Sequence, residues 1–260
     1  MSLFIASLNS GSNGNCYYIG NDTEAILVDA GISCRETELR MARLGLSIQQ
    51  VKAVFISHEH WDHIRGLPVL AKKYHLPVYI TPQTMQQAGL YGKRLTTLPF
   101  QAHQPIQIGG LQITAFPKLH DAADPHSFIV SYNDVTVGIL TDIGTCCDNV
   151  VEYFKKCQAV FLESNFDEVM LDKGGYPAYL KKRIRSMYGH LSNDQALELF
   201  RTCKSSDLTH VLLSHLSKNN NNPLLAKALF EAHAGDTEVI IASRDEPTAV
   251  FKISGSSVLI

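Results

Sequence analysis

Residues 57–63 concentrate side chains that commonly bind metal ions. The segment reads Ser-His-Glu-His-Trp-Asp-His and directly follows the apolar run 51–56. Imidazole nitrogens and carboxylate oxygens are ligands that zinc, manganese and iron accept. Two histidines at positions i and i+2 of a helix would point apart, so we expect a loop, which can turn all these side chains toward one point. A polar loop that only happens to contain histidines is the alternative, and three histidines and one aspartate in so short a segment argue against it. The predicted donors of this loop are His58, His60, Asp62 and His63.

Three further candidate ligands belong to other parts of the chain. His120, Asp142 and His215 each lie just beyond the C-terminal end of an apolar run, as His58 does. A sheet would present such residues along one edge, and side chains from several strand ends on a rigid scaffold make a precise site. Seven donors are too many for one tetrahedral ion, but they suit two ions that share a bridging carboxylate.

The apolar runs that must position these donors are short and rich in Val, Ile, Phe and Tyr, which favours strands. Helices are expected between some of them, so a helix bundle and a pure β-sandwich are both excluded. A layered α/β fold with two sheets and a Rossmann arrangement both match this order. The runs 54–58 and 211–215 both end in Ser-His, which places two histidines in equivalent settings. The expected strands are 3–8, 16–19, 25–28, 51–56, 78–80, 111–116, 127–132, 135–140, 159–162, 210–213, 239–241 and 249–253.

Helix start signals occur at five places. Ser33 with Glu36 and Ser192 with Gln195 have the spacing of a capping box. Two further capping residues precede a proline, which suits the first turn of a helix. The fifth helix should begin at Pro177, carry apolar residues at 180, 184 and 187, and end at Gly189. These two pairs of a capping residue and a proline are Thr81-Pro82 and Asn222-Pro223.

Composition excludes several classes of protein. The chain has 260 residues, 45% of them hydrophobic, with 23 basic and 25 acidic side chains, which is ordinary for a globular protein and too apolar for disorder. The net charge of −2 gives no global field for nucleic acid or membranes, although a local patch could still bind one. The six cysteines are scattered, and neither a signal peptide nor a membrane-spanning run is evident. We therefore expect one cytoplasmic domain over residues 1–260, with no linker and no membrane partner.

The combined motifs resemble the metallo-β-lactamase superfamily. H-x-H-x-D-H at 58–63 is followed by a distal histidine, an aspartate in a T-D-x-G setting and a late Ser-His, which is the five-motif signature of that superfamily. The similarity is greatest to its YycJ/WalJ branch, through segments 10–15, 120–122, 163–167, 189–193 and 214–217. The resemblance implies an αββα four-layer sandwich, with two mixed β-sheets flanked by helices and metals at one edge. It further implies that His58, His60 and His120 hold one ion, that Asp62, His63 and His215 hold the other, and that Asp142 bridges them.

Departures from other branches narrow the reaction. A thiol at the fourth motif marks one class of β-lactamases, whereas this chain has Asp142; Cys146 and Cys147 nearby are interpreted as ordinary buried cysteines. A carboxylate in place of the second histidine marks the flavodiiron proteins, whereas this chain has His60. The interval between Asp142 and His215 is too short for the extra domain of the β-CASP nucleases. These departures separate the chain from those three branches, and the resemblance to the YycJ/WalJ branch implies a phosphodiesterase.

Glu163 and His190 match a pair that protonates the leaving alkoxide in relatives similar to tRNase Z. The leaving oxygen of a phosphodiester is a poor anion, and a positioned imidazolium contributes typically about 10²–10⁴-fold to the rate. A carboxylate behind the imidazole fixes its tautomer and favours its charged form. The alternatives are a loop histidine between two helices and a surface carboxylate.

Substrate contacts are expected from two basic or polar segments. Lys181 and Lys182, with Arg183 and Arg185, form a run that either guides phosphate or is only a solvated helix face. Ser217 and Lys218 follow His215 and could contact phosphate, or could form a plain polar turn.

These residues together predict a binuclear metallohydrolase of the nuclease type, and the resemblance implies action from the 5′ end. A hydroxide between two ions would attack phosphorus, with Asp62 orienting it as well as binding metal. We expect two divalent ions per chain, zinc first and manganese or iron as alternatives, and nucleic acid as substrate, DNA in preference to RNA. Hydrolysis of a small ester (a thioester, lactone or cyclic phosphodiester) on the same site is the second hypothesis. A regulatory protein without catalysis is the third.

Overall fold

The computed structural model describes residues 2–255, and its centre is a pair of seven-stranded mixed sheets. In each sheet one half is antiparallel and the other half is parallel. The first sheet has the order β14 (Phe251–Ser254), β1 (Ser2–Asn9), β2 (Cys16–Gly20), β3 (Ala25–Val28), β4 (Val51–Phe55), β5 (Val78–Tyr79) and β6 (Thr97–Leu98). The second has the order β13 (Glu238–Ile241), β12 (His210–Ser214), β11 (Ala159–Glu163), β10 (Val135–Leu140), β9 (His126–Tyr132), β8 (Leu111–Pro117) and β7 (Pro105–Ile108).

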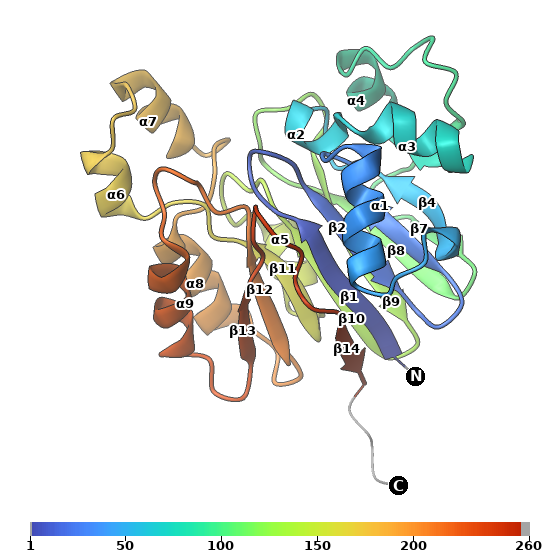
Figure 1. Ribbon diagram of the computed structural model, residues 1–260. Coiled ribbons are helices and arrows are strands. Elements are labelled where there is room, and N and C mark those ends of the chain that lie inside the picture. Colours follow the sequence, from blue (N-terminus) through green and yellow to red (C-terminus); the bar gives the residue numbers. More distant parts are fainter. Residues whose placement is uncertain (1, 256–260) are drawn as a thin grey trace, which may run out of the picture.

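Three apolar clusters separate four layers. The middle cluster joins the facing sides of the two sheets, and it includes Tyr17, whose ring centroid lies 4.9 Å from that of Phe161 at an interplanar angle of 48°. The outer face of the first sheet packs under α1 (Cys34–Arg43) and α3 (Leu67–Tyr74), and that of the second under α5 (Asp148–Phe154), α8 (Asn193–Cys203) and α9 (Pro223–Glu231) (Figure 1). Each strand buried on both faces therefore reads as a continuous apolar run. The expected αββα four-layer sandwich is confirmed, and the Rossmann alternative is excluded.

The remaining helices lie around the carboxyl ends of the parallel strands. The short helix α2 (Trp61–Ile64) follows β4, whereas α6 (Glu168–Lys173) and α7 (Ala178–Ile184) form a separate pair on the side of the second sheet (Figure 1). α4 (Pro82–Gln87) follows β5, and a single 3-10 turn spans Ile48–Gln50. Within the described residues, no helix has both the length and the apolar character to cross a membrane.

Most of the expected helix starts are confirmed. The side chains of Ser33, Thr81 and Asn222 accept hydrogen bonds from the first turn of α1, α4 and α9, and Ser192 with Gln195 forms the complete capping box of α8. Six of the described strands and α-helices were not predicted from the sequence, because they are short or lack a capping motif: β6, β7, α2, α3, α5 and α6.

Two local expectations were wrong. The metal-binding loop extends only to His60, and Asp62 with His63 lies on α2. α7 ends at Ile184 and buries none of its residues, because the chain folds back and the His190 N–H donates to the Ile184 carbonyl at 2.9 Å. Met187, expected on the apolar face of that helix, is 54% exposed.

Candidate metal centre

The site is built at the carboxyl ends of parallel strands from both sheets. His58 follows β4, Asp142 follows β10 and His215 follows β12. The chain turns sharply directly after β10 and β12. Asp142 and His215 have left-handed backbone conformations, with φ of 55° and 56°. Such conformations are costly for residues other than glycine, and they concentrate at functional sites. Here they turn the two side chains out of the sheets toward the α2 segment.

The α2 segment is held in place by a close backbone contact. A Cβ on Gly31 would lie only 1.6 Å from the carbonyl oxygen of Asp62, so glycine alone permits this approach. The Asn15 N–H donates to the same carbonyl at 2.7 Å. The loop after β3 therefore sets the position of the residues that carry the predicted donors.

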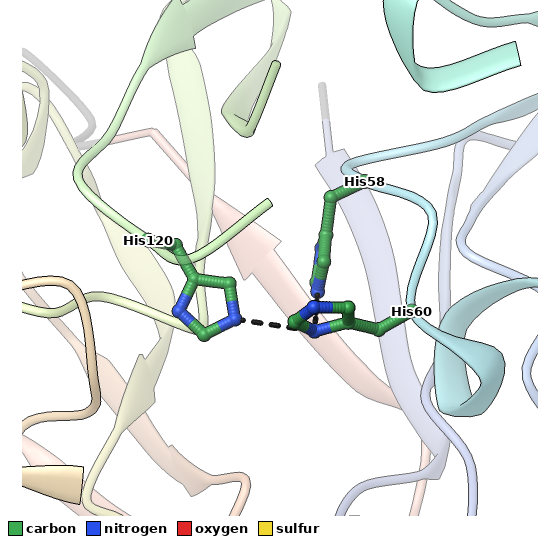
Figure 2. A group of neighbouring side chains, drawn as sticks. All are labelled: His58, His60 and His120. Atoms are coloured by element: carbon green, nitrogen blue, oxygen red, sulfur yellow. Dashed lines mark hydrogen bonds between the residues drawn. The ribbon is translucent and has the colours of Figure 1, made fainter. Parts of the chain in front are cut away.

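The first group of donors consists of three histidines. The ring nitrogens Nε2 of His58 and Nδ1 of His60 are 3.1 Å apart, and Nε2 of His120 lies 3.4 Å from the same His60 nitrogen. Figure 2 shows the three rings pointing toward one another, two from the segment after β4 and one from the segment after β8. One donor atom from each of these residues lies within 4.8 Å of the others, so the group has the geometry of a metal site.

The second group contains Asp62, His63 and His215, whose donor atoms also lie within 4.8 Å of one another. Asp142 lies between the two groups. Its Oδ2 is 3.2 Å from His63 Nε2, and its Oδ1 is 3.8 Å from His120 Nε2. The structure therefore brings all seven predicted donors together, with the predicted bridging carboxylate in the middle.

Asp29, which the sequence analysis missed, orients two of these rings. It accepts a hydrogen bond from His63 Nδ1 at 2.7 Å and one from the Ser57 hydroxyl at 2.8 Å. Since the Ser57 hydroxyl proton goes to Asp29, the serine oxygen accepts from His58 Nδ1 at 2.9 Å. Both rings therefore direct Nδ1 away from the centre and present Nε2 to it. Asp29 directly follows β3, so the signal that identified the other donors applies to it as well.

Burial and charge set the protonation of the donors. Burial lowers the pKa of His120 to about 3 and that of His58 well below its usual value, which keeps both imidazoles neutral. Burial also acts to lower the pKa of His63, but Asp142, Asp29 and Asp62 outweigh it and raise that pKa to about 10. The pKa of Asp142 is held well below its usual value, because the charges of His215 and His63 outweigh the effect of burial.

Two buried atoms at the centre lack a hydrogen-bond partner among residues 2–255. They are Oδ2 of Asp142 and Nε2 of His215. A buried polar atom without a partner costs free energy, and a coordinated cation would remove that cost. Carboxylate oxygens and imidazole nitrogens are a suitable donor set for a divalent ion. The centre therefore fits divalent metal ions.

Asp29→Asn should weaken metal binding without removing a ligand. The amide would face His63 and Ser57 with N–H groups, so the tautomer that presents Nε2 to the metal would be lost. Changes in such supporting residues cost about 10–100-fold in metal affinity. Competition titration with a chromophoric zinc chelator measures the change, and Asp22→Asn, an exposed carboxylate on a turn, serves as the matched control. An unchanged affinity would show that Asp29 has no orienting role.

Glu163 and His190 lie beside the second group of donors. Glu163 is fully buried, so the surface-carboxylate alternative is wrong. Its Oε1 accepts from His190 Nδ1 at 2.8 Å and from His215 Nδ1 at 3.0 Å, and its Oε2 accepts from the Ile143 and Leu191 N–H groups. Burial would raise the pKa of Glu163, but the neighbouring histidines lower it to about 2. Four N–H donors therefore face its two oxygens, and Glu163 also belongs to a group with Asp142, His190 and His215 whose donor atoms lie within 4.8 Å of one another.

A cavity of about 250 Å³ opens over the donors. Ser217 lines it as predicted, but Lys181, Lys182 and Lys218 do not. Lys181 donates instead to the Asp172 carbonyl at 2.6 Å. The basic run is therefore largely engaged within the protein, since Arg183 pairs with Asp121, and Arg185 with Glu168 and Asp172. Arg183 of that run does line the cavity, together with Ser12, Asn165 and Tyr176, which were not expected as substrate contacts.

Cys146 and Cys147 lie outside the groups of donors. Both are partly buried and pack against the core of the second sheet. Burial raises the pKa of the Cys146 thiol to about 12, so it remains protonated. The expectation of ordinary packed cysteines agrees with this environment.

Two mixed sheets under two helical layers, with clustered His and Asp donors at one edge, define a protein of the metallo-β-lactamase fold. Among solved structures, YhfI from Bacillus subtilis has a TM-score of 0.74 at 18% identity, covering 97% of this chain and 100% of that one. A diphosphatase of the PhnP family has a TM-score of 0.70 at 15% identity, covering 97% and 98%. These likenesses establish the shared fold.

Sequence comparison identifies the family. The model of the beta-lactamase superfamily domain matches residues 24–216. Exodeoxyribonuclease YycJ of Bacillus anthracis is 36% identical over 87% of this chain and 87% of that protein, and exodeoxyribonuclease WalJ of Streptococcus pneumoniae is 33% identical over 95% and 96%. Ribonuclease J 1 of Streptococcus pyogenes is 27% identical, over 45% of this chain and 23% of that protein. The chain belongs to the metallo-β-lactamase superfamily, in the family of YycJ and WalJ.

Proposed function

We propose that this chain is a metal-dependent nuclease that removes nucleotides from an end of DNA. The observation that carries the proposal is the buried Glu163–His190 pair beside the donors. A proton donor is needed where the leaving group is a sugar alkoxide, whereas a thiolate leaves without one. The two relatives that match over most of this chain are named exodeoxyribonucleases, which favours DNA as the substrate. The relative named a ribonuclease matches over a shorter part of the chain.

The ligand assignment is part of this proposal. His58, His60 and His120 would hold one ion, and Asp62, His63 and His215 the other, with Asp142 between them. Zinc suits the imidazole-rich set best, with manganese and iron as alternatives for the same ligands. When bound, the ions would lower the pKa of water and stabilise negative charge on phosphoryl oxygens.

The protein residues would handle the proton and the orientation of the reactants. Asp62, whose side chain is 21% exposed, faces the cavity and would accept a hydrogen bond from the attacking water. Glu163 holds Nδ1 of His190, so Nε2 of that ring would carry the proton to the leaving oxygen. The same proposal includes a single domain over residues 1–260 and a cytoplasmic location, in line with six cysteines that form no disulfide.

A substrate panel tests the proposal. Metal-stripped protein is reloaded with zinc or manganese and offered end-labelled DNA and RNA, a thioester and a lactone. We expect mononucleotides to be released from DNA faster than from RNA, and little turnover of the two esters. Faster hydrolysis of the thioester or lactone than of either nucleic acid would contradict a nuclease and favour the small-ester hypothesis.

Trp61 should stack on a base of the substrate. It lies between the predicted ligands His60 and Asp62, and it is 69% exposed. Stacking of a base on an aromatic side chain contributes about 1–3 kcal/mol, so Trp61→Ala should raise KM for single-stranded DNA about 10-fold. Because it is the chain's single tryptophan, quenching of its fluorescence by an oligonucleotide reports the contact directly. Tyr91→Ala, which alters another exposed aromatic, is the control, and absence of quenching at saturating DNA would refute the contact.

A further inference from the structure

A second cavity, of about 230 Å³, adjoins the one over the donors. Ser217 lines both cavities, and Ser10, which also lines the second, accepts a hydrogen bond from the His215 N–H at 2.8 Å. The other polar residues of its wall are Lys218, Asn221, Ser243, Arg244 and Asp245, and the rest of the wall is apolar. The second cavity is therefore linked to the proposed ligand His215 through Ser10 and Ser217. The catalytic steps proposed above give this cavity no role.

The two cations of this second cavity, Arg244 and Lys218, form no ion pair within residues 2–255. Nη1 of Arg244 is buried and has no hydrogen-bond partner among residues 2–255. Neither Arg244 nor Lys218 forms an ion pair with a carboxylate of the described chain. A guanidinium stays charged at any ordinary pH, and a buried N–H of such a group without an acceptor is costly. This arrangement indicates that an external anion supplies the acceptor.

Two hydroxyl groups of the cavity can also donate. The Ser217 oxygen already accepts from the Asn220 N–H at 3.3 Å, and the Ser243 oxygen accepts from the Asp245 N–H at 3.0 Å. Each hydroxyl proton is therefore available to an anion. Asp245 also lines the cavity, but it is exposed, as Lys218 is, so water screens both charges and the buried Nη1 of Arg244 is the main cationic donor.

The position of Arg244 is set before any ligand arrives. The Asn13 side chain donates to the Arg244 carbonyl at 2.9 Å. A Cβ on Gly11 would lie 3.3 Å from Cβ of Arg244, so the loop after β1 packs closely against this residue. The loop after β1 thus contacts both sites: Ser10 bonds to His215 of the metal centre, and Gly11 and Asn13 contact Arg244. A site fixed in this way loses little entropy on binding.

We propose that the second cavity binds the terminal phosphate of the nucleic acid substrate, a role that rests on the nuclease function proposed above. A phosphate monoester carries about −1.5 to −2 charges at neutral pH, whereas each internal diester carries one. Two cations and two hydroxyl donors therefore favour a monoester, which occurs in nucleic acids only at an end. Binding of the end in one cavity would place a nearby linkage over the metal donors, and it would make cleavage start at an end.

The test compares one oligonucleotide in three forms, with a 5′-phosphate, with a 3′-phosphate, and with hydroxyl groups at both ends. We expect one phosphorylated form to be preferred in kcat/KM by about 10-fold or more, mainly through KM. Arg244→Gln should lower this preference to about 1. Lys218→Gln, a change at an exposed position, should do the same without disturbing the fold. Arg43→Gln, which removes an exposed cation paired with Glu246, is the matched control and should retain it.

A binding measurement separates this inference from the nuclease proposal. Inorganic phosphate is titrated calorimetrically into the metal-free 260-residue chain, and Arg244→Gln should weaken its binding about 10-fold. If no oligonucleotide is cleaved but phosphate binding still depends on Arg244, the anion site stands and the nuclease proposal fails. Cleavage without preference for a phosphorylated end, or a preference that persists in Arg244→Gln, would overturn the inference.

Discussion

Asp142→Ala is expected to abolish the binding of both metal ions and to lower phosphodiester hydrolysis by at least about 10³-fold. The two oxygens of this carboxylate face both groups of donors, 3.2 Å from His63 Nε2 and 3.8 Å from His120 Nε2. In such sites the ions stabilise charge in the transition state and activate a water molecule, and these effects supply most of the rate enhancement. Elemental analysis of reconstituted protein should give about two ions per chain before the substitution and fewer than one after it.

The control for this experiment is Asp236→Ala, which removes an exposed carboxylate from a turn and should leave both readings unchanged. Thermal denaturation of the metal-free proteins shows whether the variant still folds. A variant that keeps one tightly bound ion and full activity would rule out a centre in which Asp142 bridges two ions.

His190→Ala should separate proton donation from metal binding. We expect near-normal metal content and a loss of about 10²–10⁴-fold in turnover on an unactivated phosphodiester. The loss should be far smaller on a substrate with a nitrophenolate leaving group, because that anion departs without a proton. His190 is bonded through Nδ1 to the buried Glu163 and its side chain is 21% exposed, as a group that reaches the substrate must be.

Equal losses on both substrates, or a missing metal ion, would show that His190 is a structural residue or a ligand. His233→Ala, at an exposed position, is the control. Glu163→Gln is expected to show the leaving-group pattern more weakly. It should also reduce metal affinity, because Glu163 bonds to His215 Nδ1 at 3.0 Å as well, a contact that the sequence did not reveal.

The sequence determined those features that depend on neighbouring residues. A buried strand, a capped helix start and an H-x-H-x-D-H segment each depend on a few consecutive side chains, so Ser192 with Gln195 and the segment after β4 could be recognised directly. The donors at distant positions could be proposed because each follows an apolar run. Parallel strands of a sheet end on the same side, which brings Asp142 and His215 to one edge.

Tertiary structure alone decided which side chains support that edge. Asp29 meets His63 across 34 positions of the chain, and Glu163 meets His215 across 52, and no local pattern encodes such pairs. The partners of the basic run at 181–185 could not be read from the sequence for the same reason, because Asp121, Glu168 and Asp172 belong to other segments. The buried Nη1 of Arg244, which has no hydrogen-bond partner among residues 2–255, likewise lies on a residue against which the distant loop after β1 packs. Residue type and spacing thus specify which groups can do chemistry, whereas packing over long sequence distances determines their partners, protonation and access to substrate.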